Sequence, residues 1–179
     1  DVCVTSWSRL APNTIPTGAK AGGNYAASLL PQIQAEAKGF SQVCFLDTYE
    51  GKYLEELGGM NMFVVMADGT IRTPELTGVI LEGGTRSAIL RMLRDQGVDV
   101  REEKIALSEV VDGIRSGAVA EVFACGTAAV VTPVGELRSP QGVTPAPSST
   151  ELTMQIREAL VGMQFGRAED TFGWMHRVV

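Results

Sequence analysis

Short apolar runs with the period of a β-strand alternate along this chain with longer segments that have the period of an α-helix. This alternation constrains the fold more than any other feature of the sequence. Some strand-like runs follow one another through a tight turn, as in a hairpin, whereas others are separated by a helix. A strict strand–helix–strand repeat is missing. The pattern therefore predicts one mixed α/β (α+β) domain that covers residues 1–179.

The first half of the chain is expected to contain a long helix between strands. This helix has about fifteen residues, follows a turn-rich stretch over 11–18, and ends at Lys38 and Gly39. Its apolar period falls on Tyr25, Leu29, Ile33 and Ala37. The expected strands are 2–9, 42–47 and a hairpin pair, 60–66 and 69–76, that turns at Asp68 and Gly69.

The second half is expected to hold three helices. The first spans 83–97 with Thr85 as its N-cap, and the second spans 108–117 with Ser108 as its N-cap. The third spans 151–166 and is capped by Ser149 or Thr150. The other expected elements are a strand over 98–107, a strand–turn–strand over 121–137 and an exposed loop over 138–150.

The composition is that of a globular protein and excludes several functional classes. Of the 179 residues, 45% are hydrophobic and 20% are charged, and the net charge of −6 comes without a basic cluster that would bind nucleic acid. No apolar run reaches the roughly 18 residues that a membrane span needs, and the first residues lack the layout of a signal peptide. The three cysteines, Cys3, Cys44 and Cys125, lie in apolar runs without CxxC spacing. We expect reduced thiols, no metal site and a cytoplasmic location.

Three Gly-rich turns, TGAKAGGNY, LEGGTR and ACGTAAV, are the candidates for anion binding. Such turns at a helix start present backbone N–H groups, and the helix dipole favours a negative charge there. The hydroxyl groups of Thr85 and Thr127 could add hydrogen bonds. Taken singly, each turn is more often only a turn. Nucleotide-binding motifs of the GxGxxG or P-loop type are absent from the sequence.

Five segments resemble, in order and spacing, the carboxy-terminal half of a branched-chain aminotransferase of the fold-type IV pyridoxal-phosphate group. These segments are TGAKAGGNYAASL, EELGGMNMFVV, TPELTGVILEGGTR, EVFACGTAAVVTPV and EDTFGWM. The resemblance covers essentially the whole chain. It implies the carboxy-terminal pseudo-barrel domain of the D-amino-acid aminotransferase-like fold, with pyridoxal 5'-phosphate as cofactor.

The same resemblance implies a role for individual residues. Lys20 matches the lysine that binds the cofactor covalently and then moves the proton, and it is the implied catalytic residue. Tyr25 matches the tyrosine on the cofactor's phenolic oxygen. Glu56 matches the carboxylate that faces the pyridine nitrogen, whereas its neighbour Glu55 is expected to be a supporting or surface residue. Leu81 matches the aliphatic residue that packs on the cofactor ring.

The phosphate end of the cofactor is implied to bind at two of the Gly-rich turns. Gly84 and Thr85 align with the phosphate-binding turn at a helix N-terminus, and Thr127 matches a second phosphate ligand. The backbone of Thr127 and Ala128 resembles the receptor for the substrate carboxylate. Met60 and Asn61 correspond to pocket-lining positions, but a place in the core of the hairpin fits them equally well.

The sequence departs from the family at the phosphate turn and in its length. Glu82 stands where proline is usual and Gly84 where Val or Ile is usual, which predicts weaker or altered cofactor binding. Full-length relatives are about twice as long as this chain. We expect the amino-terminal half to be supplied by a missing segment or a partner chain, in an assembly that is homodimeric in the family.

The leading interpretation is pyridoxal-phosphate-dependent transamination between a branched-chain amino acid and 2-oxoglutarate. Two alternatives remain open at this point. One is other chemistry with the same cofactor, such as a lyase reaction or transfer from D-amino acids. The other is a stand-alone domain that acts as a biosynthetic catalyst or a binding module without pyridoxal phosphate.

Overall fold

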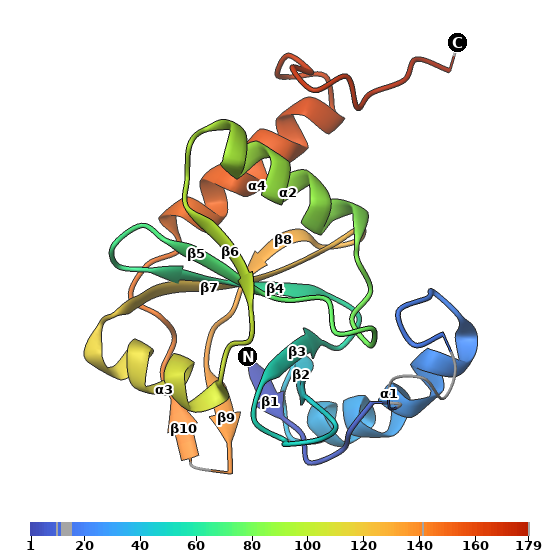
Figure 1. Ribbon diagram of the computed structural model, residues 1–179, viewed down its shortest axis with the longest axis vertical. Helices are drawn as coiled ribbons and strands as arrows, with labels where there is room; N and C mark the ends of the chain where they lie inside the picture. The colour runs from blue at the N-terminus through green and yellow to red at the C-terminus, as the bar shows by residue number, and fades with distance from the viewer. Residues whose placement is uncertain (10, 12–15, 141, 179) are drawn as a thin grey trace.

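The computed structural model describes residues 1–9, 11, 16–140 and 142–178, and in those residues it contains two five-stranded mixed sheets and four helices (Figure 1). The first sheet has the order β10 (Gly142–Thr144), β9 (Leu137–Ser139), β1 (Val2–Val4), β2 (Gln42–Leu46) and β3 (Leu54–Leu57). The second has the order β6 (Val100–Glu103), β5 (Ile71–Pro74), β4 (Asn61–Met66), β7 (Val119–Gly126) and β8 (Val130–Pro133). The helices are α1 (Gly22–Glu36), α2 (Gly84–Asp95), α3 (Leu107–Ser116) and α4 (Glu151–Gln164). The predicted mixed α/β fold is confirmed.

The second sheet is built on β4, whose side chains alternate between two cores. Met62 and Val64 pack into a cluster shared with the first sheet and α3, whereas Phe63 and Val65 pack into a cluster shared with α2 and α4. Phe63 stacks on Phe123 of β7, with ring centroids 4.9 Å apart. Burial of both faces explains why this strand is apolar throughout rather than alternating with polar residues.

The helices cover different faces of the two sheets. Figure 1 shows α2 and α4 lying together over one face of the second sheet, with α3 on the other side near β9 and β10, and α1 beside the first sheet. Apolar side chains of α2 and α4, including Ile89, Leu93, Ile156 and Leu160, belong to the same buried cluster. The apolar faces of these two helices and the second sheet therefore form one core.

Several expected boundaries were wrong. The strand expected over 2–9 ends at Val4, because its neighbours β2 and β9 pair with only three of its residues. Strand β3 was not predicted, and β9 and β10 occupy a part of the chain that was expected to be a loop. Strand β9 pairs in parallel with β1, where Leu137 lies opposite Val2, and local periodicity does not report such distant pairing. Strand β10 is the antiparallel partner of β9, and β3 is the antiparallel partner of β2.

The predicted helix caps were also wrong in part. Helix α2 begins after Gly83 and α3 after Ala106, so Thr85 and Ser108 lie inside the first turns rather than at the N-caps. At α4, Ser149 accepts a hydrogen bond from the N–H of Glu151 at 3.1 Å, whereas the Thr150 side chain makes no capping bond. Gly83 is the N-cap residue of α2, and its φ of +69° is a conformation that glycine adopts without strain. The helix therefore begins at a backbone turn and has no capping side chain.

Helix α1 has the predicted length of fifteen residues, but its apolar stripe is on the outside. Leu29 and Ile33 are each 62% exposed, and Leu30 is 47% exposed. The side that faces the protein is formed by Asn24, Pro31 and Ala35. A stripe of this kind is normally covered in the functional assembly of a protein.

The three cysteines are free thiols in β1, β2 and β7, as predicted. In the described part of the chain, none of the helices combines the length and apolar character that crossing a membrane would require. The same residues contain no cluster of His, Cys, Asp and Glu that could hold a metal ion. Of the turn expected over 11–18, residues 12–15 lie outside the described residues.

Candidate functional site

Lys20 lies in the loop before α1, and a buried amide fixes the backbone of this loop. The side chain of Asn24 is 2% exposed, and its Nδ2 donates hydrogen bonds at 3.0, 3.1 and 2.6 Å to three carbonyl oxygens, those of Pro16, Thr17 and Ala19. The Thr17 hydroxyl donates to the carbonyl oxygen of Gly78 at 2.5 Å. Lys20 itself is exposed. The fold thus holds the lysine's backbone against the segment that begins at Gly78.

Glu56 is a buried carboxylate with two fixed hydrogen-bond donors. It is 2% exposed, its Oε2 pairs with the guanidinium of Arg9, and its Oε1 accepts the backbone N–H of Leu81 at 2.6 Å. Arg9 is also buried, and its guanidinium lies 5.9 Å from the ring centroid of Phe45. A buried charge needs a partner of opposite sign. The pair therefore keeps both side chains in place where Leu81 passes β3.

Glu55, the neighbour of Glu56, is buried as well, so the expectation of a surface position is wrong. Its side chain is 4% exposed, and its Oε2 has no hydrogen-bond partner among the described residues. Burial, followed by the nearby charge of Asp47, raises the pKa of Glu55 to about 7. The two adjacent carboxylates therefore have different electrostatic surroundings.

The turn from Leu81 to Thr85 connects the Glu56 carboxylate to the start of α2. Asn61 donates through Nδ2 to the carbonyl oxygen of Leu81 at 2.8 Å, and a Cβ added at Gly83 would lie 2.1 Å from Asn61 Oδ1. Gly83 also has a φ of +69°, so a side chain there would be excluded by both space and backbone conformation. At Gly84, by contrast, a Cβ would meet no atom within 4 Å.

The first turn of α2 and the turn after β7 line one cavity of about 500 Å³. Gly84, Thr85 and Thr127 come from these two turns, and Arg91 of α2 lines the cavity farther along the helix. The start of an α-helix leaves backbone N–H groups without partners inside the helix, and no side chain caps α2. Amide donors, hydroxyl groups and a guanidinium around a cavity favour a negatively charged ligand.

The structure brings some predicted site residues together and leaves others apart. Gly84, Thr85 and Thr127 share the cavity, and Glu56 is bonded to the backbone of Leu81. Tyr25 is half-buried and lies beside the turn between β3 and β4. A Cβ built on Gly59 in this turn would lie 3.8 Å from Tyr25 Cε1. Lys20 and Ala128 are exposed and do not line the cavity.

Three residues that support this site were missed in the sequence. Arg9 pairs with Glu56, Asn24 holds the Lys20 loop, and Arg157 of α4 bonds to two carbonyl oxygens just after the Thr127 turn. An arginine within an apolar, strand-like run was a signal for Arg9, because such a residue needs a buried acid. Neither Asn24 nor Arg157 carries a comparable signal, since their partners are backbone atoms.

A family model described as "Amino-transferase class IV" matches residues 1–137, which is more than half of the chain. The chain belongs to the aminotransferase class IV family. The family model covers the Lys20 loop, β3, the start of α2 and the Thr127 turn, whereas Arg157 and the part of the cavity wall formed by α4 and the following segment lie beyond the matched residues.

Curated relatives of this class IV domain are branched-chain-amino-acid aminotransferases. A probable enzyme of this kind from Streptomyces coelicolor is 47% identical over 160 residues, which is 88% of this chain and 44% of the relative. The enzyme from Mycobacterium tuberculosis is 44% identical over 180 residues, 97% of this chain and 48% of the relative. The chain thus spans about half the length of the curated relatives that it matches.

Solved structures of branched-chain amino acid aminotransferases have the same fold. The Escherichia coli enzyme superposes with a TM-score of 0.83 at 38% identity, over 100% of this chain and 55% of that chain. The T.th. enzyme in complex with N-(5'-phosphopyridoxyl)-L-glutamate gives a TM-score of 0.84 at 32% identity, over 99% and 56% of the two chains. The fold-type IV assignment of this class IV aminotransferase domain is therefore confirmed.

Proposed function

We propose that this chain is the cofactor-bearing part of an enzyme that transfers amino groups from branched-chain amino acids to 2-oxoglutarate with pyridoxal 5'-phosphate. The observation that carries the proposal is the short connection between two unlike sites. The buried Glu56 carboxylate bonds to the N–H of Leu81, and only three residues later the chain enters the first turn of α2 at the cavity. The cofactor has the matching pair of groups, an aromatic nitrogen and a phosphate.

The residues present fit this cofactor. Each oxygen of a carboxylate can accept two hydrogen bonds, so Glu56 has capacity for a pyridine N–H beyond its bonds with Arg9 and Leu81. Gly84 leaves open space where a side chain would stand, and the N–H groups of the first turn of α2 are suited to a phosphate. Thr127 adds a hydroxyl group on the same cavity. Pyridoxal phosphate is the cofactor implied by the family, and the T.th. enzyme described above is in complex with a phosphopyridoxyl derivative.

In this proposal each residue of the site acts on a defined atom. Gly84, Thr85 and Thr127 hold the phosphate, and Glu56 holds a proton on the pyridine nitrogen. Tyr25 donates to the phenolic oxygen, Leu81 packs on the ring, and the backbone of Thr127 and Ala128 binds the substrate carboxylate. When bound, the cofactor withdraws electrons from the α-carbon of the substrate. Lys20 is the residue whose amine would hold the cofactor covalently, and the same amine would accept the α-proton of the amino acid and return it to the cofactor side.

We further propose that residues 1–179 form one cofactor-binding domain and that a second polypeptide region completes the site. Two observations support this. The relatives extend over about twice the matched length, and α1 carries the exposed apolar residues Leu29, Leu30 and Ile33. The added region would supply a further cation for the phosphate and a wall for the substrate side chain, within a homodimer. Three free thiols, two of them buried, support a reducing, cytoplasmic environment.

The open space at Gly84 favours one alternative, in which the cofactor is kept but serves a different reaction. A glycine in place of the Val or Ile expected there leaves the phosphate end of the cavity more open, and a cofactor held there would be free to take a different position. A lyase reaction or transfer from D-amino acids would then be the outcome. The remaining possibility is a domain that acts as a catalyst or a binding module without pyridoxal phosphate.

The test is a single-turnover experiment on the full 179-residue chain loaded with pyridoxal phosphate. L-leucine and L-valine are expected to convert the bound cofactor to its amino form and to release one equivalent of the 2-oxo acid, detected by NMR. Lys20→Ala should abolish the conversion, whereas Lys38→Ala, another exposed lysine, should leave it unchanged. Conversion by D-amino acids alone, or release of pyruvate and ammonia from added L-serine by elimination of water, would replace the proposed reaction with the alternative. Failure to take up the cofactor, both in this chain alone and in this chain joined to the region that completes the site, would overturn both.

A further inference from the structure

Val130 has a backbone conformation that a β-branched residue rarely adopts. Its φ is +57°, and it is the only residue other than glycine with positive φ among the described residues. Val130 is the first residue of β8 and directly follows the turn 127–129, which carries the Thr127 hydroxyl to the cavity. In the left-handed region a side chain collides with its own backbone, and the clash is worst when the side chain is branched at Cβ. Something outside the turn must therefore hold this conformation.

Arg157 is placed to do so. Its Nη1 donates to the carbonyl oxygens of Ala129 and Val131, each at 2.6 Å, and these two carbonyl groups flank Val130. Strand β8 is the last strand of its sheet, so carbonyl groups on its outer side have no neighbouring strand to bond with. A charged donor that bonds to both carbonyl groups ties the peptide plane before Val130 and the peptide plane after Val131 to one atom, so the backbone between them, which includes Val130, is held from both ends.

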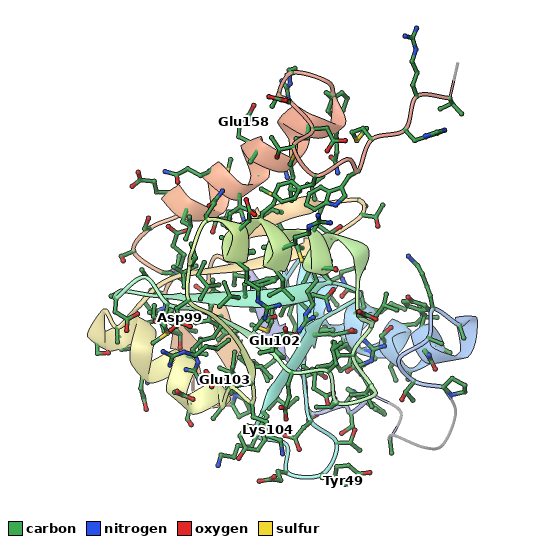
Figure 2. The ribbon with its side chains drawn as sticks, turned by 45° about the horizontal axis from the view of Figure 1, so that its top comes forward. Tyr49, Asp99, Glu102, Glu103, Lys104 and Glu158 are labelled. Carbon is green, nitrogen blue, oxygen red and sulfur yellow. The ribbon has the colours of Figure 1, made fainter. Side chains whose placement is uncertain are left out.

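The helix that carries Arg157 is itself fixed to the same sheet. Glu121 of β7 accepts hydrogen bonds from the N–H groups of Leu152 and Thr153 at the start of α4, at 2.9 and 2.8 Å. Ile156 and Leu160 are buried against the second sheet. The neighbouring Glu158, by contrast, lies on the outer surface of α4 (Figure 2). Arg157 therefore reaches the turn from a rigid support.

We propose that Arg157 is a positioning residue that holds Thr127 in its phosphate-binding geometry by imposing the left-handed conformation on Val130. The inference rests on the proposed function, because it names what keeps the phosphate end of that same site in shape. Without Arg157, Val130 relaxes toward extended backbone, and the turn 127–129 rotates Thr127 away from Gly84 and Thr85. The residue touches neither cofactor nor substrate, so its effect passes through the turn alone.

A first experiment measures the imposed strain without any ligand. Urea unfolding is compared for the wild-type chain, Val130→Gly, Arg157→Met and the double variant. Glycine relieves strain only while Arg157 imposes it, so Val130→Gly should be more favourable for stability in the wild-type background than in Arg157→Met. Residues coupled in this way have non-additive effects. Additive effects would overturn the proposal.

A second experiment isolates the phosphate contacts. Dissociation constants are measured for pyridoxal phosphate and for pyridoxal, which lacks the phosphate, through quenching of tryptophan fluorescence; Trp174 lines the cavity. Arg157→Met should weaken binding of pyridoxal phosphate by roughly tenfold, which corresponds to loss of the hydrogen bond between the Thr127 hydroxyl and the charged phosphate. Binding of pyridoxal should be nearly unchanged. Arg157→Lys, which can still donate to both carbonyl oxygens, and the double variant with Val130→Gly should each recover most of the loss.

Arg167→Met is the matched control, because Arg167 is exposed and its guanidinium makes a long ion pair with Glu158, at 3.9 Å, and lies 5.7 Å from the ring centroid of the exposed Phe165. It should change neither constant. Equal losses for pyridoxal phosphate and pyridoxal in Arg157→Met, or no recovery in the double variant, would show a general structural role and overturn the inference. A wild-type chain that binds both compounds alike would overturn the phosphate site and the inference together. Failure of amino transfer in a chain that passes these tests would instead count against the proposed function.

Discussion

At the scale of single residues, the two glutamates of β3 illustrate what the sequence can and cannot convey. Glu55 and Glu56 are adjacent, and both are buried. Only Glu56 has a guanidinium and a backbone N–H as direct partners, whereas the pKa of Glu55 is raised to about 7 by burial and by Asp47. The resemblance to the family selected Glu56 from the pair. The physical distinction depends on Arg9 and Leu81, which are remote in sequence.

The raised pKa of Glu55 predicts a pH-dependent contribution to stability. The folded chain holds the proton more tightly than the unfolded chain, whose carboxyl group has a pKa near 4.5. The contribution is therefore fully present below about pH 4.5 and is lost as the pH rises through about 7. The wild-type chain should lose at most about 3 kcal/mol of unfolding free energy over this pH window because of Glu55, and the Glu55→Gln variant should not show this loss. The measurement is the urea unfolding free energy of the variant and of the wild type at a series of pH values. A difference between the two that stays constant with pH would contradict the prediction.

Thiol reactivity gives a second prediction at this scale. Burial raises the pKa of both Cys44 and Cys125 to about 12, with Glu55 adding to the effect at Cys44. Since the thiolate is the reactive form, neither residue should react with iodoacetamide in the native chain at pH 8. Cys3 is only half-buried and should be modified first. Mass spectrometry of tryptic peptides reads out the order, and early modification of Cys125 would contradict the packing of β7 against α4.

At the scale of elements, local pattern identified the helices and most strands and missed three short strands. The helices and the β4–β5 hairpin carry their own periodicity and turn residues, such as Asp68 and Gly69, and they were predicted with errors of a few residues. The missed strand β9 depends on its distant partner β1, and the missed strands β10 and β3 are short edge strands beside β9 and β2. The cap of α4 is another case, because it comes from Glu121, twenty-eight or more positions before the residues that it binds.

Glu121 therefore controls the stability of α4. Burial alone would raise its pKa, but hydrogen bonds from Thr153, Leu152 and Ser149 outweigh that effect and hold the pKa below its usual value. Its stabilising contribution is present above the unfolded pKa of about 4.5 and is lost as the pH falls through the lower folded value. Glu121→Gln should cost roughly 1–3 kcal/mol at pH 7 and less at low pH.

Urea unfolding of Glu121→Gln at pH 7 and at pH 4 checks this prediction. Glu151→Gln serves as the control, because Glu151 is exposed on the first turn of the same helix and its side chain makes only a long contact with Gln155, at 3.4 Å. The control should change stability by a few tenths of a kcal/mol at most. Equal costs for the two variants at pH 7 would mean that the buried cap does not stabilise α4.

At the scale of the whole molecule, the outer surface of α1 fits the proposal that a further polypeptide region completes the site. Helix α1 follows the Lys20 loop and presents Leu29, Leu30 and Ile33 to the outside. The periodicity predicted these residues as one apolar face, but it could not tell whether this domain or another one buries that face. The charged network around β6 is different, because Glu102 bonds to both Arg86 and Arg94 within the domain (Figure 2).

The exposed stripe on α1 predicts substitutions that barely affect the stability of this chain. Replacing Leu29 and Ile33 with Ser should change the unfolding free energy by less than about 1 kcal/mol, because both are mostly exposed. Phe63→Ala, at the centre of a buried cluster, should cost about 3–5 kcal/mol. Analytical ultracentrifugation of the double Ser variant should also show less self-association than the wild type. A large loss of stability would mean that the stripe packs within this domain.

The central claim is that Lys20, held by Asn24 beside the Gly78–Leu81 segment, binds pyridoxal phosphate covalently. The most direct measurement is to incubate the chain with pyridoxal phosphate, reduce it with borohydride, digest it and locate the modification by mass spectrometry. The account predicts one dominant phosphopyridoxyl group, on Lys20, and its loss in Lys20→Ala. It also predicts much lower occupancy in Asn24→Ala, in which the loop is no longer held. Modification spread over exposed lysines such as Lys38, with no preference for Lys20, would contradict the claim.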